Sequence, residues 1–282
     1  MRREAAAAGR HRGGSGGSVL PVYPDHWRKG GTVMDVFYED TYRVDSRDLD
    51  LFGQCRPSAV LGLLQEAATQ AACAIHLSGA EVRSKYNAFW MLARVRYELS
   101  RPLWWNEPVT IRTWHRGGRA AVMYREFDLW VKGEKVGQAL SAWVLAGMES
   151  HKLLHLAEVG EIEDTSGGTL CRTDTIRKLR LPAELEVAEE RRLHYSDTDV
   201  NGHVNNTRYA DLLCDALGLE AIGAGKFVSQ LQLCYLTECL AGETVRLRKG
   251  RDDKGWCVHG ESLDGIGRFD GILTLDNLFP ED

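Results

Sequence analysis

The chain has 282 residues, of which 44% are hydrophobic and 27% charged, and its formal net charge is −5. This composition is typical of a soluble globular protein. We expect no membrane span, because no apolar run reaches the roughly 18 residues that a spanning helix needs. The acidic balance argues against a general nucleic-acid binder. The seven cysteines contain no CxxC pair, which favours reduced thiols in a cytoplasmic protein over a disulfide framework.

The chain begins with MRREAAAAGRHRGGSGGS, a stretch with almost no large apolar side chains. Because such a stretch cannot form a core, we predict a disordered tail over residues 1–30. It lacks the apolar region of a secretory signal, and it is short and rich in glycine rather than serine. We therefore expect a cytoplasmic location of the bacterial type. A plastid location would follow only if this tail were the remnant of a transit peptide.

Residues 31–157 are predicted to form a strand, a loop, a long helix and then four strands. Pro57 suits the first turn of a helix, and the apolar residues after it recur at helical spacing over an arc wide enough to be buried on most sides. Turns are expected at Gly117-Gly118 and Gly133-Glu134. The predicted strands are Val36–Val44, Ala88–Ser100, Val109–Trp114, Ala120–Val131 and Lys135–Ala146.

Residues 158–186 are polar and contain glycine, which predicts a linker. Residues 187–282 then repeat the earlier order: a strand ends at His194, and Asn205 or Asn206 is the expected N-cap of a second helix. The strands predicted after this helix are Lys226–Leu236, Thr244–Lys249, Trp256–Leu263 and Arg268–Leu275. Each half is thus an α+β unit, in which an antiparallel sheet wraps around one long buried helix.

The two halves, residues 31–157 (the first copy) and 187–282 (the second copy), are an internal repeat. The segment RDLDLFGQ, residues 47–54, aligns with SDTDVNGH, residues 196–203. Both copies keep two aspartates and a glycine. They differ at two polar positions, where Phe52 and Gln54 align with Asn201 and His203 respectively.

The densest polar cluster, YSDTDVNGHVNN, covers residues 195–206. Asp199, Asn201 and His203 are two residues apart, so in an extended segment their side chains point the same way. The N-terminus of the predicted helix follows, and its free N–H groups can stabilise an oxyanion formed on an attacked carbonyl. This arrangement predicts a catalytic site.

The same residue types are common in turns. If turn geometry alone selected them, both copies would carry similar side chains. The first copy instead has Phe52 and Gln54, which favours a chemical role for Asn201 and His203. The aspartate recurs in both copies, so Asp199 has the weakest case for such a role.

Residues 197–209 resemble the hot-dog thioesterase signature DxDxxGHVNNxxY, and nearly all of the chain from about residue 37 resembles the acyl-acyl carrier protein (acyl-ACP) thioesterases of plants and bacteria. The resemblance implies a tandem double hot-dog fold and one active site per chain, in the second copy, with the first copy shaping the acyl pocket. The other segments that carry it are PSAVLGLLQEA (57–67), RP (101–102), EPVTIRTW (107–114), SAWVL (141–145) and YLTEC (235–239).

The family places its catalytic Asp, Asn and His on a DxNxH stretch, which here matches Asp199, Asn201 and His203. It adds an acidic residue followed by cysteine, here Glu238 and Cys239. We expect Glu238 to activate water as a general base and His203 to position or share the proton. Asn201 would orient the thioester carbonyl or the water. Asp199 would either fix the His203 ring or attack as a nucleophile through an acyl anhydride.

A papain-like triad with Cys239 as the nucleophile is the alternative. Adjacent residues on a strand face opposite sides, so only one of Glu238 and Cys239 can point at His203, and we favour Glu238. In the first copy, the point that matches Glu238 lies near Pro102, so that copy lacks this member of the site as well.

The implied reaction is hydrolysis of fatty acyl-ACP thioesters, which terminates fatty acid synthesis. The alternatives are a hot-dog thioesterase for acyl-CoA or aromatic acyl-CoA and, third, a non-catalytic acyl-binding protein. We expect no cofactor and no metal: His151 and His155 have no arranged ligand partners. The fused repeat favours a monomer and also allows a homodimer. The linker also contains a basic stretch, Arg172, Arg177, Lys178 and Arg180. Charge runs are usually solvated surface, but because carrier protein is acidic, our hypothesis is that this stretch is its docking face.

Overall fold

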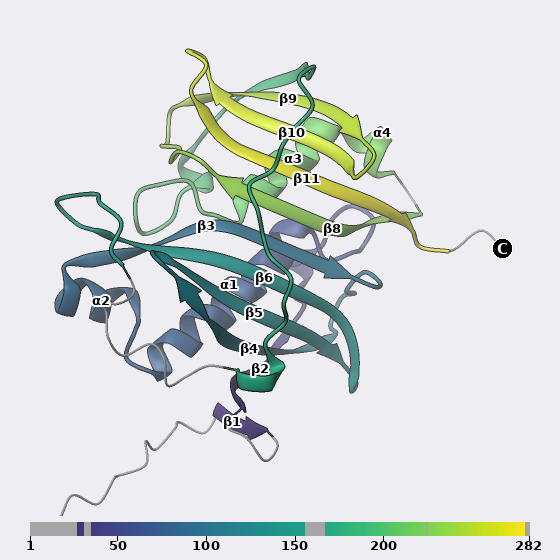
Figure 1. Ribbon diagram of the computed structural model, residues 1–282. Helices are drawn as coiled ribbons and strands as arrows, with labels where there is room; N and C mark the ends of the chain where they lie inside the picture. The colour runs from purple at the N-terminus through teal and green to yellow at the C-terminus, as the bar shows by residue number, and fades with distance from the viewer. Residues whose placement is uncertain (1–26, 31–34, 156–166, 224, 280–282) are drawn as a thin grey trace, which may run out of the picture.

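The computed structural model describes residues 27–30, 35–155, 167–223 and 225–279 (Figure 1). Most of the predicted tail, residues 1–26, lies outside this range, as do residues 158–166 of the predicted linker. Within the described residues, no helix is both long enough and apolar enough to cross a membrane.

The described strands form one antiparallel sheet in the order β1-β2-β4-β5-β6-β3-β8-β11-β10-β9-β7. The strands are β1 Trp27–Gly30, β2 Asp35–Arg43, β3 Ala88–Leu99, β4 Pro108–Arg119, β5 Val122–Val131, β6 Glu134–Gly147, β7 Glu186–Arg192, β8 Lys226–Tyr235, β9 Thr244–Asp252, β10 Gly255–Ser262 and β11 Gly267–Asn277. The helices are α1 Pro57–Ala74, α2 Gly79–Tyr86, α3 Arg208–Leu217 and α4 Leu219–Ile222, with 3-10 turns η1 Ser46–Asp48, η4 Gly168–Leu170 and η5 Tyr195–Asp197.

The two copies join where β3 pairs with β8, from Arg94 opposite Cys234 to Glu98 opposite Gln230. The first copy's sheet curves around α1 and the second copy's around α3 (Figure 1). One hydrophobic core runs through both copies. The tandem double hot-dog architecture predicted from the sequence is therefore confirmed, with the copies fused edge to edge.

The helix predicted from Pro57 is confirmed, and its wide apolar arc is buried. The turn predicted at Gly117-Gly118 is wrong. β4 continues through these glycines to Arg119, with a register shift after His115. The chain turns instead at Ala120, whose φ is +56°.

Further elements differ from the sequence analysis. β1 occupies the end of the stretch predicted to be a disordered tail over residues 1–30, where it pairs with β2, and α4 was not predicted. α2 was not predicted, although Ser78 and Glu81 form a capping box at its start. The N-cap of α3 is Thr207 rather than Asn205 or Asn206. The Asn205 side chain instead accepts a hydrogen bond from the Thr207 N–H at 2.9 Å, so it closes the turn before the helix.

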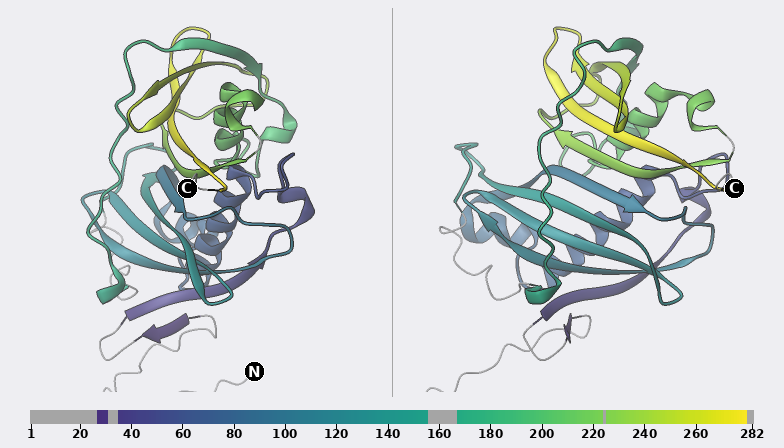
Figure 2. Two further views of the ribbon diagram at one scale, coloured as in Figure 1. Left: turned by 90° about the vertical axis from the view of Figure 1, so that its right-hand side faces the viewer. Right: turned by 45° about the vertical axis from the view of Figure 1, so that its right-hand side comes forward.

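The described part of the linker lies across the outer face of the sheet, opposite the helices (Figures 1 and 2). On the first copy, Arg116 donates to the carbonyl of Asp174 at 2.6 Å, and Ile176 is buried against β6. On the second copy, Gln232 donates to the carbonyl of Arg177 at 2.8 Å. The linker therefore fastens both copies from outside.

Candidate active site

The loops after η1 and η5 have the same backbone structure. The carboxylate of Asp50 accepts the N–H of Phe52 at 2.9 Å, and that of Asp199 accepts the N–H of Asn201 at 2.8 Å. Gly53 and Gly202, which follow in the two loops, have φ values of +79° and +80°. Because the first copy lacks the polar cluster yet has the same turn, this contact of Asp199 is a structural one.

A second loop, residues 236–243 between β8 and β9, lies beside the first. The Val204 N–H donates to the Cys239 carbonyl at 2.9 Å, as the Cys55 N–H donates to the Leu103 carbonyl at 2.8 Å in the first copy. Leu103 is therefore the structural equivalent of Cys239. By the same register Pro102 is the equivalent of Glu238, as the sequence repeat predicts.

The structure brings His203 and Glu238 together. The His203 Nε2 lies 3.3 Å from Glu238 Oε2, and the side chains are 37% and 51% exposed. A carboxylate and an imidazole at this distance, open to solvent, can hold a water molecule and move its proton. Asn201 lies exposed in the same loop, and in the described part of the chain its side chain makes no hydrogen bond to this pair.

Cys239 faces away from the pair, into the core. Its side chain is fully buried beside Tyr209, and burial raises the pKa of its thiol. A nucleophilic cysteine needs the opposite, a lowered pKa and partial exposure. The geometry thus supports Glu238 over Cys239 as the functional member of the loop.

For the thioester hydrolysis that the sequence resemblance implies, we expect Cys239→Ala to keep most of the wild-type kcat, because the buried thiol faces away from the His203–Glu238 pair. Initial rates on one acyl-thioester substrate would show this, with the thermal midpoint measured alongside to detect the small cavity that the substitution leaves. A loss of kcat as large as that of His203→Ala, in a variant that is still folded, would instead establish Cys239 as the nucleophile.

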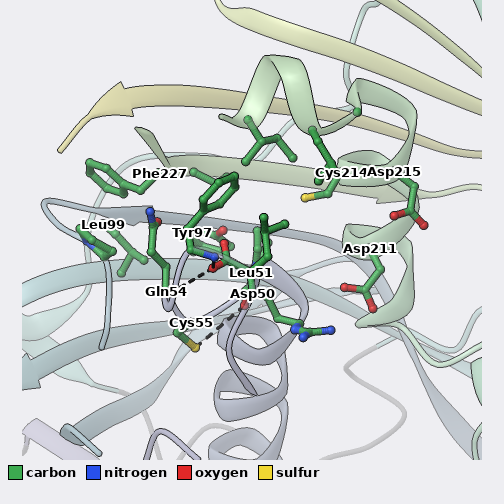
Figure 3. Close-up of a pocket in the computed structure, with 18 of the residues that line it drawn as sticks. Asp50, Leu51, Gln54, Cys55, Tyr97, Leu99, Asp211, Cys214, Asp215 and Phe227 are labelled. Atoms are coloured by element: carbon green, nitrogen blue, oxygen red, sulfur yellow. Dashed lines mark hydrogen bonds between the residues drawn. The ribbon is translucent and has the colours of Figure 1, made fainter. Parts of the chain in front are cut away.

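A cavity of about 480 Å³ lies at the first copy's loop rather than at the His203–Glu238 pair (Figure 3). Phe52, Gln54 and Pro102 all line it, and these are the equivalents of Asn201, His203 and Glu238. In the first copy, the positions equivalent to Asn201, His203 and Glu238 therefore all face the same cavity. In the first copy the Gln54 amide is used structurally, since its Nε2 donates to the Lys226 carbonyl at 2.8 Å.

The opposite wall of each cavity comes from the other copy. Cys214 of α3 lines the cavity of the first copy. A narrower cavity of about 20 Å³ lies between Leu64 and Gln65 of α1 and Asn206 and Tyr235 of the second copy, and Asn201, His203 and Glu238 do not line it. Both cavities thus lie at the junction of the copies, and in the second of them α1 faces the segment just after His203, which the repeat in the sequence did not indicate.

Solved structures with the same architecture include acyl-ACP thioesterases. An acyl-ACP thioesterase from Bacteroides thetaiotaomicron aligns with a TM-score of 0.72 at 21% identity, covering 85% of this chain and 98% of that one. The 12:0-ACP thioesterase from Umbellularia californica aligns with a TM-score of 0.72 at 19% identity, covering 86% and 97%. These likenesses establish the fold.

Residues 35–161 match the acyl-ACP thioesterase N-terminal domain and residues 183–264 match the C-terminal domain of that family. The chain belongs to the acyl-ACP thioesterase family. A curated relative, oleoyl-acyl carrier protein thioesterase 2 of Arabidopsis thaliana, is 24% identical over 247 residues, which are 78% of this chain and 65% of the relative. Dodecanoyl-[acyl-carrier-protein] hydrolase of Cinnamomum camphora is 22% identical over 263 residues, covering 86% and 66%. The chain spans about two thirds of the length of these relatives.

Proposed function

We propose that this protein hydrolyses fatty acyl-ACP thioesters to free fatty acids and carrier protein. The observation that carries the proposal is the His203–Glu238 pair, 3.3 Å apart. The pair occurs in the second copy only. The equivalent residues of the first copy, Gln54 and Pro102, both line one cavity. Membership of the acyl-ACP thioesterase family supports the choice of substrate.

In the proposed reaction the Glu238 carboxylate takes a proton from water, with His203 sharing the charge. The water oxygen then bonds to the thioester carbon, and Asn201 orients the carbonyl. When the carbon–sulfur bond breaks, the proton passes to the departing carrier thiolate. The products are a fatty acid and a free thiol, and the Glu238–His203 pair returns to its starting state.

The anhydride route through Asp199 has less support. The Asp199 carboxylate holds the loop by accepting the Asn201 N–H, as Asp50 holds the loop of the first copy. A carboxylate that repeats in a copy without Asn201 and His203 is accounted for by the turn. We therefore propose that water, activated at Glu238, is the nucleophile.

We propose that the acyl chain extends from the pair toward the first copy, between α1 and its sheet. Apolar side chains line the narrow cavity there, among them Leu64, Leu92 and Trp143. Its volume of about 20 Å³ is close to the room that a single water needs. Binding of an acyl chain therefore requires partly buried residues such as Leu92 and Trp143 to move.

The reaction is tested by incubating the wild-type protein with one acyl-ACP and measuring both free fatty acid and free carrier thiol, with His203→Ala as the blank. Equal amounts of the two products, absent from the blank, support the proposal. Failure of the wild type to release either product, in a folded preparation and over a series of chain lengths, would contradict it.

Carrier docking is assigned to the exposed basic residues of the linker, Arg177, Lys178 and Arg180. The Arg177 carbonyl is held by Gln232 of β8, the strand that leads into the loop of Glu238. Arg172, which the sequence grouped with these residues, serves the fold instead. Its guanidinium donates to Asp128 at 2.8 Å and to the Ala139 carbonyl at 2.9 Å.

We expect the double change Arg177→Glu and Lys178→Glu to raise KM for acyl-ACP on the order of tenfold at low salt, because charges at the rim of an interface act mainly on encounter. The kcat should stay near that of the wild type. Lys178→Glu alone is compared with Lys254→Glu in the β9–β10 turn as the control, since each reverses one exposed positive charge. An unchanged KM for acyl-ACP, or an equal rise in the control, would argue against docking on the linker.

Two further expectations stay predictions. The β3–β8 pairing supplies within one chain the junction that a single hot-dog unit obtains by dimerising, so we expect a monomer, with a homodimer as the alternative. A cytoplasmic location likewise remains an expectation from the composition.

A further inference from the structure

The loop that carries Glu238, residues 236–243, is held by one residue of β11. The Arg268 backbone carbonyl accepts the N–H groups of Leu236 at 2.9 Å and Thr237 at 3.2 Å. Its guanidinium donates to the carbonyl oxygen of Glu238 at 2.9 Å and pairs with Glu243 at 3.2 Å. The Arg268 side chain is only 13% exposed and that of Glu243 is 30% exposed, so the ion pair is partly shielded from water.

The first copy makes the same contacts with an arginine from another position. Arg101 donates to the carbonyl of Pro102 at 2.8 Å and forms a two-pronged pair with Glu107 at 3.0 and 3.1 Å. Pro102 and Glu107 are the equivalents of Glu238 and Glu243. In both copies, a guanidinium thus ties the same carbonyl to the glutamate at the loop's end.

The two arginines are not equivalent in the repeat. The Val136 carbonyl accepts the Ser100 N–H at 2.9 Å, as the Arg268 carbonyl accepts the Leu236 N–H. Val136 of the first copy is therefore the structural equivalent of Arg268 in the second copy. Because Ser100 is the equivalent of Leu236, the next residue, Arg101, is the equivalent of Thr237. Each copy provides the guanidinium from a different strand or loop position, which indicates that the loop itself requires one.

In the second copy this loop also carries chemistry. Glu238 is the residue whose carbonyl is held, and the next residue accepts the N–H of Val204, the neighbour of His203. Both members of the pair are therefore fixed through one loop. Without the guanidinium, the Glu238 backbone loses its only described side-chain donor, and the 3.3 Å approach to His203 is no longer enforced.

We propose that Arg268 is a positioning residue for the hydrolysis: it holds the backbone of Glu238 so that its carboxylate stays in reach of His203. This inference rests on the proposed function for its kinetic consequence. Its structural consequence, the geometry of the His203–Glu238 pair, does not depend on which substrate is hydrolysed.

Arg268→Gln is expected to lower kcat for acyl-ACP about 10- to 100-fold with little change in KM, since a displacement of about 1 Å at a reacting group can cost that much. Arg101→Gln is the matched control, because it removes the same contacts from the copy without the pair. Both variants should lose a similar amount of thermal stability, and only Arg268→Gln should lose kcat.

A transplant separates positioning from a general effect on folding. Adding Thr237→Arg to Arg268→Val gives the second copy the arrangement of the first, and we expect this double variant to recover much of the kcat that Arg268→Val loses. In addition, the NMR signals of the His203 ring should shift in Arg268→Gln and stay in place in Arg101→Gln.

Unchanged kcat and unchanged His203 signals in folded Arg268→Gln would overturn the inference, as would an equal fall of kcat in Arg101→Gln. A wild-type protein that hydrolyses no acyl-ACP would overturn the proposed function instead. In that case the His203 signals alone decide whether Arg268 positions the pair.

Discussion

Glu238→Gln is expected to lower kcat for acyl-ACP hydrolysis by about 10²–10⁴-fold, the usual contribution of a positioned general base. The amide keeps the size of the side chain and its contact distance to His203, but it cannot take a proton from water. Since Glu238 is half-exposed and its backbone contacts are retained, stability and KM should change little. Steady-state rates on one acyl-ACP, with thermal melting of both proteins, provide the measurement.

Asp199→Asn is the informative companion variant. Its side-chain oxygen still accepts the Asn201 N–H and so preserves the turn, but an amide cannot form the acyl anhydride. Water activation at Glu238 predicts that Asp199→Asn loses far less activity than Glu238→Gln. The reverse order would favour the anhydride route, and full activity in a Glu238→Ala enzyme would reject the assignment of Glu238.

Glu126→Ala should destabilise the fold by about 3–5 kcal/mol, because removing one partner of a buried charge pair leaves the other uncompensated. The Glu126 side chain is fully buried and lies 2.8 Å from the Arg116 guanidinium. It also accepts the Trp114 indole N–H at 2.9 Å and the backbone N–H of Arg172 at 3.1 Å. The substitution thus disturbs the first copy and its attachment to the linker together.

The free energy of unfolding, measured by urea titration, tests this prediction. Asp253→Ala, in the exposed β9–β10 turn, is the control and should change stability by less than about 0.5 kcal/mol. If Glu126→Ala cost no more than the control, the buried cluster would contribute little and the linker would owe its position to other contacts.

Local signals in the sequence predicted the parts of the fold that depend on nearby residues. Pro57 and the apolar spacing after it located α1 because helix starts and helical faces are local properties. The turn at Gly117-Gly118 was mistaken for a similar reason, since glycine pairs favour turns. In the structure these glycines lie at an irregularity in β4, and the chain turns at Ala120. The position of the turn is set by the pairing of β4 with β5 rather than by local residue preference.

The candidate site was predictable in part from the repeat and in part from the family resemblance. Comparison of the copies singled out Asn201 and His203, whereas Glu238 came from the resemblance, and the repeat added only that Pro102 takes its place in the first copy. Arg268 escaped because the repeat aligns it with Val136, while the arginine with the same contacts, Arg101, aligns with Thr237. When the same contact is made by arginines at different aligned positions of the two copies, an alignment of the copies does not reveal it.

The basic linker shows the same limit. The sequence grouped four basic residues as a docking face, but the structure uses Arg172 to bind the linker to the outer sheet. The Arg172 side chain is only 22% exposed, unlike its exposed neighbours, and this partial burial depends on long-range packing that composition does not reveal.

The most direct test of the central claim is the initial rate of hydrolysis of one acyl chain presented on acyl carrier protein and on coenzyme A, repeated over a matched set of chain lengths. An acyl-ACP thioesterase activity predicts a large preference for the carrier-bound substrate, and the same data give the chain-length preference. Equal or faster hydrolysis of the acyl-CoA would contradict the claim and place the activity with the broader hot-dog thioesterases.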